Sequence, residues 1–182
     1  MALTKTPVCD FGKKAEDFKL KSINNKVITL NDIRGEKATL IMFICNHCPY
    51  VKAIIKDLAK DCNELKKDGI NSVAIMSNDT KNYPEDSFEN MIDFAENNNF
   101  GEIDYLFDET QEIAKKYGAV CTPDFFGYNK DLSLQYRGRF RELKDLKPIN
   151  NGDSDLKIAM KMVAQTQKGP DEQIPSMGCN IK

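Results

Sequence analysis

Residues 38–50 read ATLIMFICNHCPY, and this stretch decides which fold the chain can adopt. Its first part, 38–44, is a continuous apolar run, which predicts a β-strand that is covered on both faces. Two cysteines, Cys45 and Cys48, follow directly, together with His47, the only histidine of the chain. The stretch therefore predicts a buried strand that leads into a Cys-x-x-Cys motif.

A helix is predicted directly after this motif. Pro49 suits a first helical turn, apolar residues recur at helical spacing from Val51 to Leu65, and Gly69 marks a stop. Alternating strand and helix signals then continue along the chain. They predict strands at 26–30, 70–76 and 103–107, a helix from Pro84, a helix between Asp108 and Gly118, a hairpin over 125–136 and a last helix capped by Asp153 or Ser154. This order predicts an α/β protein with three layers, in which helices flank a central mixed β-sheet.

The length of 182 residues suits one well-buried domain. No internal repeat or low-complexity linker interrupts the sequence. The last segment, 169–182, contains two prolines and shows neither helical nor strand periodicity. We therefore expect one domain over 1–168, followed by an extended C-terminal tail over 169–182.

The composition argues against several classes of function. Hydrophobic residues make up 41% of the chain, charged residues 30%, and the net charge is −2, as in ordinary soluble proteins. Basic residues form no separate block, so no nucleic-acid partner is expected. No apolar run is long enough to cross a bilayer, and the N-terminus shows no secretory signal. Six cysteines are too few for a disulfide scaffold, so we expect a cytoplasmic protein.

The predicted position of the Cys-x-x-Cys motif gives it a chemical role. The ends of strands in open α/β sheets are where ligands gather, and a first helical turn stabilises a thiolate with its unpaired N–H groups and its dipole. Such settings lower the pKa of a cysteine from about 8.5 to roughly 3.5–7.5. The two-residue spacing lets Cys45 and Cys48 form and release a disulfide, and a protonated His47 would favour the Cys45 thiolate further. We interpret the motif as a redox centre.

The motif allows two other interpretations. Both cysteines are buried, inert thiols in the first. In the second they bind zinc, but the chain has no second Cys-x-x-Cys motif and no histidine pair, so the remaining ligands would have to come from Cys9, Cys62, Cys121 and Cys179. A c-type haem site is excluded, since it needs a histidine directly after the second cysteine, where this chain has Pro49.

Three segments carry a resemblance to a known family. They are residues 12–20 (GKKAEDFKL), the strand and helix around CNHC, and residues 116–123 (KYGAVCTP). On the basis of these segments the chain resembles the thioredoxin-fold superfamily, and the resemblance covers most of the chain. It is most similar to the redoxin branch of peroxiredoxin-like and TlpA-like proteins, because the predicted helix-strand pair at 78–107 is an insertion that a minimal thioredoxin lacks.

The resemblance implies a thiol–disulfide oxidoreductase. Cys45 would attack the partner disulfide, Cys48 would resolve the mixed disulfide, and Pro123 would be the cis-proline of a loop that faces the motif and binds an extended substrate. Substrate-binding or tuning roles fall on Asn46, His47, Thr122 and Pro123. No cofactor is expected beyond the dithiol, and no Gly-rich dinucleotide motif occurs. The expected partners are a disulfide-containing protein or small molecule and an upstream thiol reductant.

The chain departs from two family patterns. Peroxiredoxins carry Pro-x-x-x-Thr/Ser-x-x-Cys, whereas Ala38 and Met42 precede Cys45 at those positions. Thioredoxin has a buried acid in the preceding strand, where this chain has Thr39. A peroxiredoxin-like thiol peroxidase, with an antioxidant role, is therefore the alternative. A non-catalytic metal- or partner-binding module is the second alternative.

The remaining cysteines and several charged residues each allow a functional and a plainer interpretation. Cys121 and Cys179 are candidates for additional redox thiols, although a buried loop residue and a bystander in the tail are the plainer interpretations. Cys62 falls on the apolar stripe of its predicted helix and is expected to be core packing. Asp79 follows a buried strand and either orients a water or His47 or only makes a turn. Every second residue from 137 to 141 is an arginine, so the three side chains are expected to share one face of the second hairpin strand. This face is either solvated or a surface that contacts an acidic partner.

Overall fold

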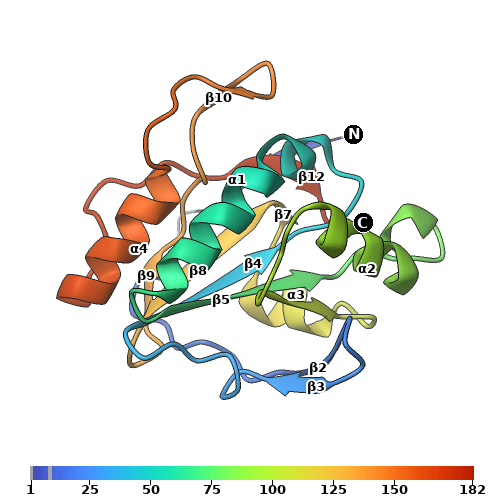
Figure 1. Ribbon diagram of the computed structural model, residues 1–182, viewed down its shortest axis with the longest axis horizontal. Coiled ribbons are helices and arrows are strands. Elements are labelled where there is room, and N and C mark those ends of the chain that lie inside the picture. Colours follow the sequence, from blue (N-terminus) through green and yellow to red (C-terminus); the bar gives the residue numbers. More distant parts are fainter. Residues whose placement is uncertain (1, 8–9) are drawn as a thin grey trace.

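The computed structural model describes residues 2–7 and 10–182, so Cys9 lies outside the described residues. Within them, a seven-stranded mixed sheet forms the centre of the molecule, in the order β3-β2-β6-β5-β4-β8-β9 (Figure 1). Its strands are β2 (Lys19–Ser22), β3 (Val27–Thr29), β4 (Ala38–Phe43), β5 (Ile70–Met76), β6 (Asp104–Phe107), β8 (Asp124–Asn129) and β9 (Leu134–Tyr136). The predicted three-layer α/β fold is confirmed.

Strand β4 lies inside this sheet and carries the decisive stretch. It pairs in parallel with β5 and antiparallel with β8, and all of its residues are buried. Strand β5 pairs in parallel with β6. The carboxyl ends of β4, β5 and β6 therefore meet at one edge of the sheet, and the Cys-x-x-Cys motif leaves β4 at this edge.

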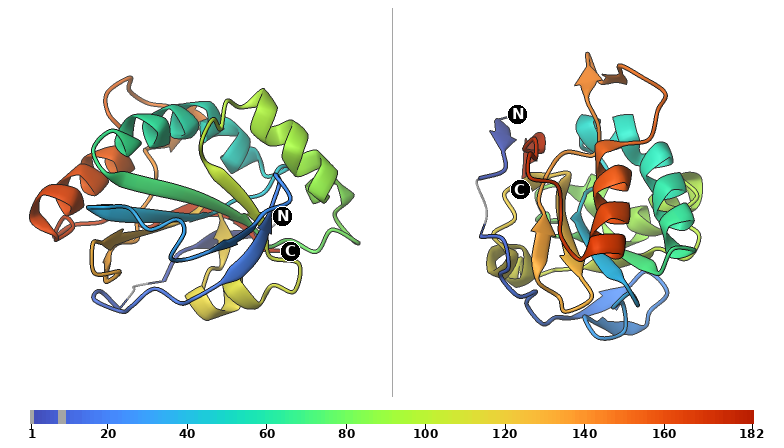
Figure 2. Two further views of the ribbon diagram at one scale, coloured as in Figure 1. Left: turned by 60° about the horizontal axis from the view of Figure 1, so that its bottom comes forward. Right: turned by 90° about the vertical axis from the view of Figure 1, so that its left-hand side faces the viewer.

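Helices cover both faces of the sheet. Helices α1 (Pro49–Lys66), α2 (Phe88–Asn97) and α4 (Asp155–Thr166) share one core with β4 and β5, whereas α3 (Glu112–Tyr117) packs on the opposite face (Figure 2). The stripe predicted for the last helix is buried, namely Leu156, Ala159, Met160 and Val163. None of the helices in the described ranges is both long and apolar enough to span a membrane.

Three helix starts show how local capping shifts a predicted boundary. The helix expected from Pro84 begins as a single 3₁₀ turn, η1 (Pro84–Asp86), and α2 starts only after Ser87, whose side chain accepts from the Asn90 N–H. Helix α3 begins after Gln111, and Asp108 instead accepts two N–H groups of its first turn. Ser154 caps α4, as one of the two predicted caps.

A second, small sheet joins both ends of the described chain to the middle. Strand β12 (Met177–Asn180) lies between β1 (Leu3–Lys5) and β7 (Cys121–Thr122) and pairs antiparallel with both. The tail over 169–182 thus contains a strand that its sequence pattern did not predict. A short hairpin, β10 (Leu143–Lys144) with β11 (Lys147–Pro148), projects beyond the sheet.

The arginine pattern does not mark a strand face. Strand β9 ends at Tyr136, so the three arginines lie in the irregular segment that follows. Arg137 is buried and forms an ion pair with Asp124, with 3.0 Å between Nη2 and Oδ2. The predicted solvated face was wrong for Arg137, because the buried carboxylate of Asp124 needs a partner charge.

Candidate active site

The two cysteines of the motif occupy different backbone positions. Cys45 lies in the link after β4, and Cys48 is the N-cap of α1, directly before Pro49. The Val51 N–H of the first helical turn donates to the Cys48 sulfur. The stabilisation expected from the helix start therefore acts most directly on Cys48, whereas the sequence pattern had assigned it to Cys45.

The pair shares one proton between two sulfurs. The Cys45 thiol donates a hydrogen bond to Cys48 and thereby lowers the pKa of Cys48 to about 4, with further donation from Cys179 and the Val51 N–H. The same hydrogen bond, burial and the nearby Asp86 carboxylate raise the pKa of Cys45 well above its ordinary value. The directions of the two pKa shifts favour a negative charge on Cys48 over one on Cys45 when the reduced pair loses a single proton.

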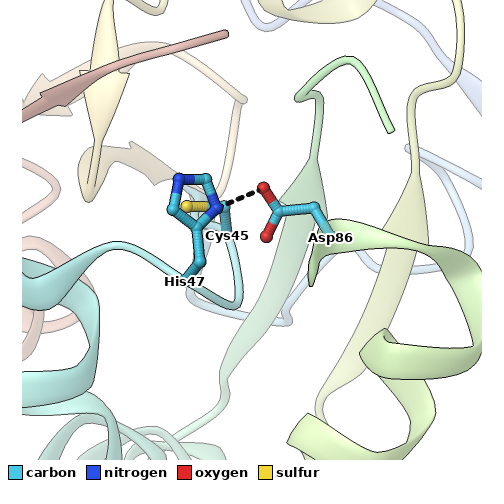
Figure 3. Close-up of side chains that lie close together, drawn as sticks. All are labelled: Cys45, His47 and Asp86. Atoms are coloured by element: carbon cyan, nitrogen blue, oxygen red, sulfur yellow. Dashed lines mark hydrogen bonds and ion pairs between the residues drawn. The ribbon is translucent and has the colours of Figure 1, made fainter. Parts of the chain in front are cut away.

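His47 is positioned by a carboxylate that sequence reasoning missed. Its Nδ1 lies 2.6 Å from Oδ2 of Asp86, which is fully buried (Figure 3). The Cys45 sulfur, a ring nitrogen of His47 and a carboxylate oxygen of Asp86 all lie within 4.8 Å of one another. Tyr83 stacks on the His47 ring, with centroids 5.6 Å apart and planes 4° from parallel. A cysteine beside a histidine oriented by an acid is a proton-transfer arrangement.

This triad is also the cluster of the described chain that offers metal ligands, with one sulfur, one nitrogen and one oxygen. The hydrogen bond between His47 Nδ1 and Asp86 Oδ2 orients the imidazole ring beside the Cys45 sulfur. The geometry therefore fits proton transfer to and from Cys45.

Buried hydrogen bonds fix the loop between the two cysteines. Asp86 accepts from the Asn46 N–H at 2.7 Å and from Asn78 Nδ2 at 2.8 Å, in addition to its contact with His47. The Tyr105 hydroxyl donates to Asn46 Oδ1 at 2.9 Å. Asn46, predicted as a tuning residue, thus anchors the loop to the 3₁₀ turn η1 and to β6. Asp86 carried no distinguishing signal in the sequence, because an acid after Pro84 also suits a helix start.

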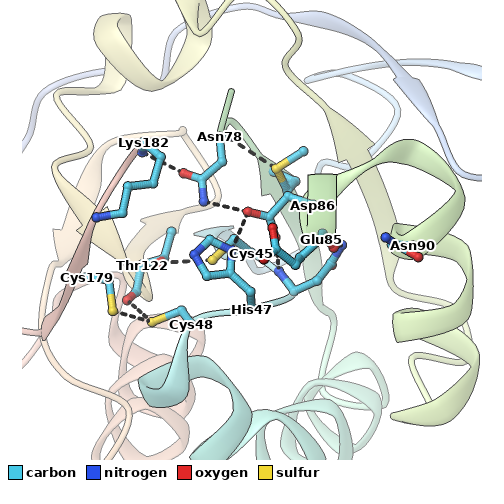
Figure 4. Close-up of polar contacts among 12 residues, drawn as sticks. Cys45, His47, Cys48, Asn78, Glu85, Asp86, Asn90, Thr122, Cys179 and Lys182 are labelled. Atoms are coloured by element: carbon cyan, nitrogen blue, oxygen red, sulfur yellow. Dashed lines mark hydrogen bonds and ion pairs between the residues drawn. The ribbon is translucent and has the colours of Figure 1, made fainter. Parts of the chain in front are cut away.

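The loop that contains Thr122 and Pro123 faces the motif, and the peptide bond between them is cis. The Cys48 sulfur lies 3.2 Å from the Thr122 carbonyl oxygen, and the Cys45 sulfur lies 3.4 Å from Thr122 Oγ1 (Figure 4). The structure therefore brings all six predicted catalytic and tuning residues together, namely Cys45, Asn46, His47, Cys48, Thr122 and Pro123.

The other predicted candidates separate into two groups. Cys179 lies at the site, with its sulfur 3.1 Å from the Cys48 sulfur. Cys121 is buried in β7 and directs its thiol to the Pro123 carbonyl at 3.5 Å. Cys62 packs in the core, where burial raises its pKa to about 12. Asp79 is half-buried, and its side chain accepts hydrogen bonds from the turn residues that follow it, so the role of orienting His47 suggested for Asp79 falls to Asp86.

Comparisons with known proteins agree with this architecture. The sequence profile described as the AhpC/TSA family matches residues 11–140. An uncharacterized conserved protein from Geobacillus kaustophilus is 39% identical, with a TM-score of 0.94, over 100% of this chain and 96% of its own. A hypothetical protein from Sinorhizobium meliloti is 36% identical, with a TM-score of 0.90, over 98% of this chain and 97% of its own.

More distant similarity concerns the fold alone. The thioredoxin domain of a thiol-disulfide oxidoreductase from Bacteroides vulgatus is 16% identical, with a TM-score of 0.60, over 71% of this chain and 89% of its own. A search of curated proteins finds no match.

Proposed function

Because the chain belongs to the AhpC/TSA family and has a thioredoxin-like fold, we propose that it is a thiol–disulfide oxidoreductase that uses Cys45 and Cys48. Family and fold support a redox function in general. The observation that carries the specific proposal is the geometry around the motif, in which the Cys45 sulfur lies within 4.8 Å of His47 and Asp86 and 3.4 Å from Thr122 Oγ1, while Cys48 caps α1. A thiolate is the species that attacks a disulfide.

The proposed reaction consists of two exchanges. The shared proton passes from Cys45 to Cys48, and the Cys45 thiolate attacks one sulfur of the substrate disulfide, releasing the first substrate thiolate. Cys48 then attacks the Cys45 sulfur of the mixed disulfide, and its proton passes to the departing second sulfur of the substrate. The products are a Cys45–Cys48 disulfide and a second substrate thiol, so the substrate gains the two electrons that the protein loses.

Surrounding groups support the proton movements in this scheme. His47 lies beside Cys45, and its hydrogen bond to Asp86 fixes the orientation of its ring. Thr122 contacts both sulfurs, with its hydroxyl toward Cys45 and its carbonyl toward Cys48. In the proposal His47 relays protons for Cys45, and the loop at Pro123 lines the position of the substrate. A thiol reductant returns the pair to its dithiol form.

The test measures reduction of a disulfide-containing protein with dithiothreitol as the electron source. Wild type is expected to accelerate the reaction, and Cys45→Ser and Cys48→Ser are expected to abolish the acceleration. Cys48→Ser should accumulate a mixed disulfide with the substrate on Cys45, detected by mass spectrometry. Cys62→Ser, a core thiol, is the matched control and keeps the activity.

Two results would count against the proposal. Full activity in Cys45→Ser would remove the assigned nucleophile. Oxidation by hydrogen peroxide that is much faster than exchange with any disulfide would favour the peroxidase alternative, which family membership also allows.

A further inference from the structure

Strand β12 holds Cys179 in a defined place. Its register puts Cys179 opposite Thr122 of β7 on one side and opposite Leu3 of β1 on the other. Next to it, the Ser176 hydroxyl donates to the Pro123 carbonyl at 2.7 Å. Pairing on both edges and this anchor mean that Cys179 belongs to the wall of the site.

The sulfur atoms of Cys179 and Cys48 are within reach of bond formation. They lie 3.1 Å apart, and both residues are buried (Figure 4). That separation is about 1 Å more than the roughly 2.05 Å of a disulfide bond, so small side-chain rotations are enough to form one. Cys121 lies on the neighbouring strand β7, but its thiol points to the Pro123 carbonyl.

Gly178 is what allows this close approach. A Cβ atom at this position would lie 2.0 Å from the Thr122 carbonyl oxygen and 3.1 Å from Pro123 Cδ. Any larger residue would push β12 away from β7, and Cys179 would move away from Cys48 with it. Gly178 therefore controls both the distance between β12 and β7 and the distance between the Cys179 and Cys48 sulfurs.

The chemistry of Cys179 depends on the oxidation state of the motif. In the reduced protein, burial, the hydrogen bond to Cys48 and the negative charge of Cys48 together raise the pKa of Cys179 to about 12. When Cys48 enters a disulfide, its charge disappears and these two causes disappear with it. Lys182 lowers the pKa of Cys179 in both states. Cys179 is therefore most readily deprotonated when an oxidised partner is present.

We propose that Cys179 is a third redox-active thiol of this site, which attacks the Cys48 sulfur of an oxidised Cys45–Cys48 pair. The step breaks the Cys45–Cys48 bond, forms a Cys48–Cys179 bond and leaves Cys45 as a thiolate, which takes up the proton that Cys179 lost. No electrons are gained or lost overall. The inference rests on the proposed function, because the Cys45–Cys48 disulfide is its starting point.

The product differs from the starting disulfide in two ways. Cys45, beside His47, becomes a free thiol again, while the oxidised bond ties β12 to the start of α1. Because β12 also occupies the edge of β7, the Cys48–Cys179 bond locks the tail over that edge. The proposed exchange thus keeps the oxidised state in the protein as a Cys48–Cys179 disulfide. It also regenerates the reduced thiol of Cys45, the residue assigned to attack the substrate.

The test uses the full chain with the oxidant diamide, acid quenching and disulfide mapping by peptide mass spectrometry. Wild type is expected to show the Cys45–Cys48 bond first, followed by a Cys48–Cys179 bond as Cys45 becomes alkylatable. Cys45→Ser, which leaves Cys179 as the neighbouring sulfur, should form the Cys48–Cys179 bond directly. Cys121→Ser in the same background is the matched control and should give the same bond.

A backbone variant tests the geometry separately. Gly178→Val in the Cys45→Ser background should reduce the rate of Cys48–Cys179 bond formation by at least about tenfold, because the effective concentration of one thiol at the other falls. Circular dichroism confirms that each variant is folded before its result is used.

The outcomes separate this inference from the proposed function. A folded Cys45→Ser protein that forms no Cys48–Cys179 bond, while wild type still forms Cys45–Cys48 and reduces substrate, overturns the inference alone. A Cys48–Cys121 bond in its place also overturns it. Wild type that forms no Cys45–Cys48 bond and reduces no substrate would instead contradict the proposed function.

Discussion

At the scale of single residues, one buried carboxylate organises the site. Asp86 accepts hydrogen bonds from the Asn46 backbone and the Asn78 side chain and contacts His47 Nδ1, and it lies close to the Cys45 sulfur. Its charge has two opposing consequences. It orients the proton-carrying ring of His47, and it makes the Cys45 thiolate less favourable.

The effect of this charge on Cys45 is testable. In a Cys48→Ser background, which removes the hydrogen bond between the two thiols, Asp86→Asn should lower the pKa of Cys45 by about one unit, because a nearby negative charge is lost. The measurement is the pH dependence of Cys45 alkylation. Asp79→Asn changes a half-buried acid whose side chain binds only its own turn, and it should leave the midpoint unchanged. An upward shift in the Asp86 variant would mean that orientation of His47 outweighs the charge.

The shared proton predicts how the reduced protein titrates. With the pKa of Cys48 lowered to about 4, its thiolate is present above that pH and is protonated as the pH falls through it. Ultraviolet thiolate absorbance of reduced wild type should therefore persist from neutral pH down to this region and then disappear. Cys48→Ser should lack the acidic transition. Thiolate absorbance that appears only near the ordinary cysteine pKa of about 8.5 would contradict the shared proton.

At the scale of elements, an ion pair fixes the loop that faces the motif. Asp124 directly follows Pro123, and its carboxylate accepts from Arg137 through Nη2 at 3.0 Å and Nε at 3.3 Å. The two side chains are 0% and 6% exposed, respectively. The pair therefore joins the start of β8 to the segment after β9 in a setting that excludes water.

Breaking this pair should be costly. Arg137→Met leaves the Asp124 carboxylate buried without its partner charge, and we expect a loss of about 3–5 kcal/mol in the free energy of unfolding. Urea denaturation measures it. Arg139→Met breaks more exposed ion pairs with Asp155 and Glu142 and should cost no more than about 1 kcal/mol. Equal losses of unfolding free energy in the two variants would contradict this account, because they would show that burial does not make the Asp124–Arg137 pair more costly to break.

Local patterns were enough to predict most elements but not the contacts between them. The run 38–44 and the stripe after Pro49 predicted β4 and α1, since each carries its own periodicity. Asp86 and Tyr105 reach the Cys-x-x-Cys loop only through the packing of β4 beside β5 and β6, and their local sequence gave no sign of it. Strand β12 was missed because a four-residue strand that contains a glycine shows no alternation.

At the scale of the whole molecule, both ends of the described chain close over one edge of the sheet. Strands β1 and β12 lie beside the loop at Pro123, opposite the motif that leaves β4. Residues far apart in sequence thus surround a single pair of sulfurs. The arrangement gives that pair a supporting acid and histidine on one side and a further thiol on the other.

The most direct test of this account is a redox titration of the Cys45–Cys48 pair. Cys179→Ser protein, in which the pair is isolated from its third thiol, is equilibrated in glutathione buffers of graded potential, quenched in acid and mapped by mass spectrometry. We predict one reversible two-electron transition that converts both thiols into a Cys45–Cys48 disulfide. Thiols that stay alkylatable at every potential, or that oxidise only irreversibly, would contradict a thiol–disulfide oxidoreductase.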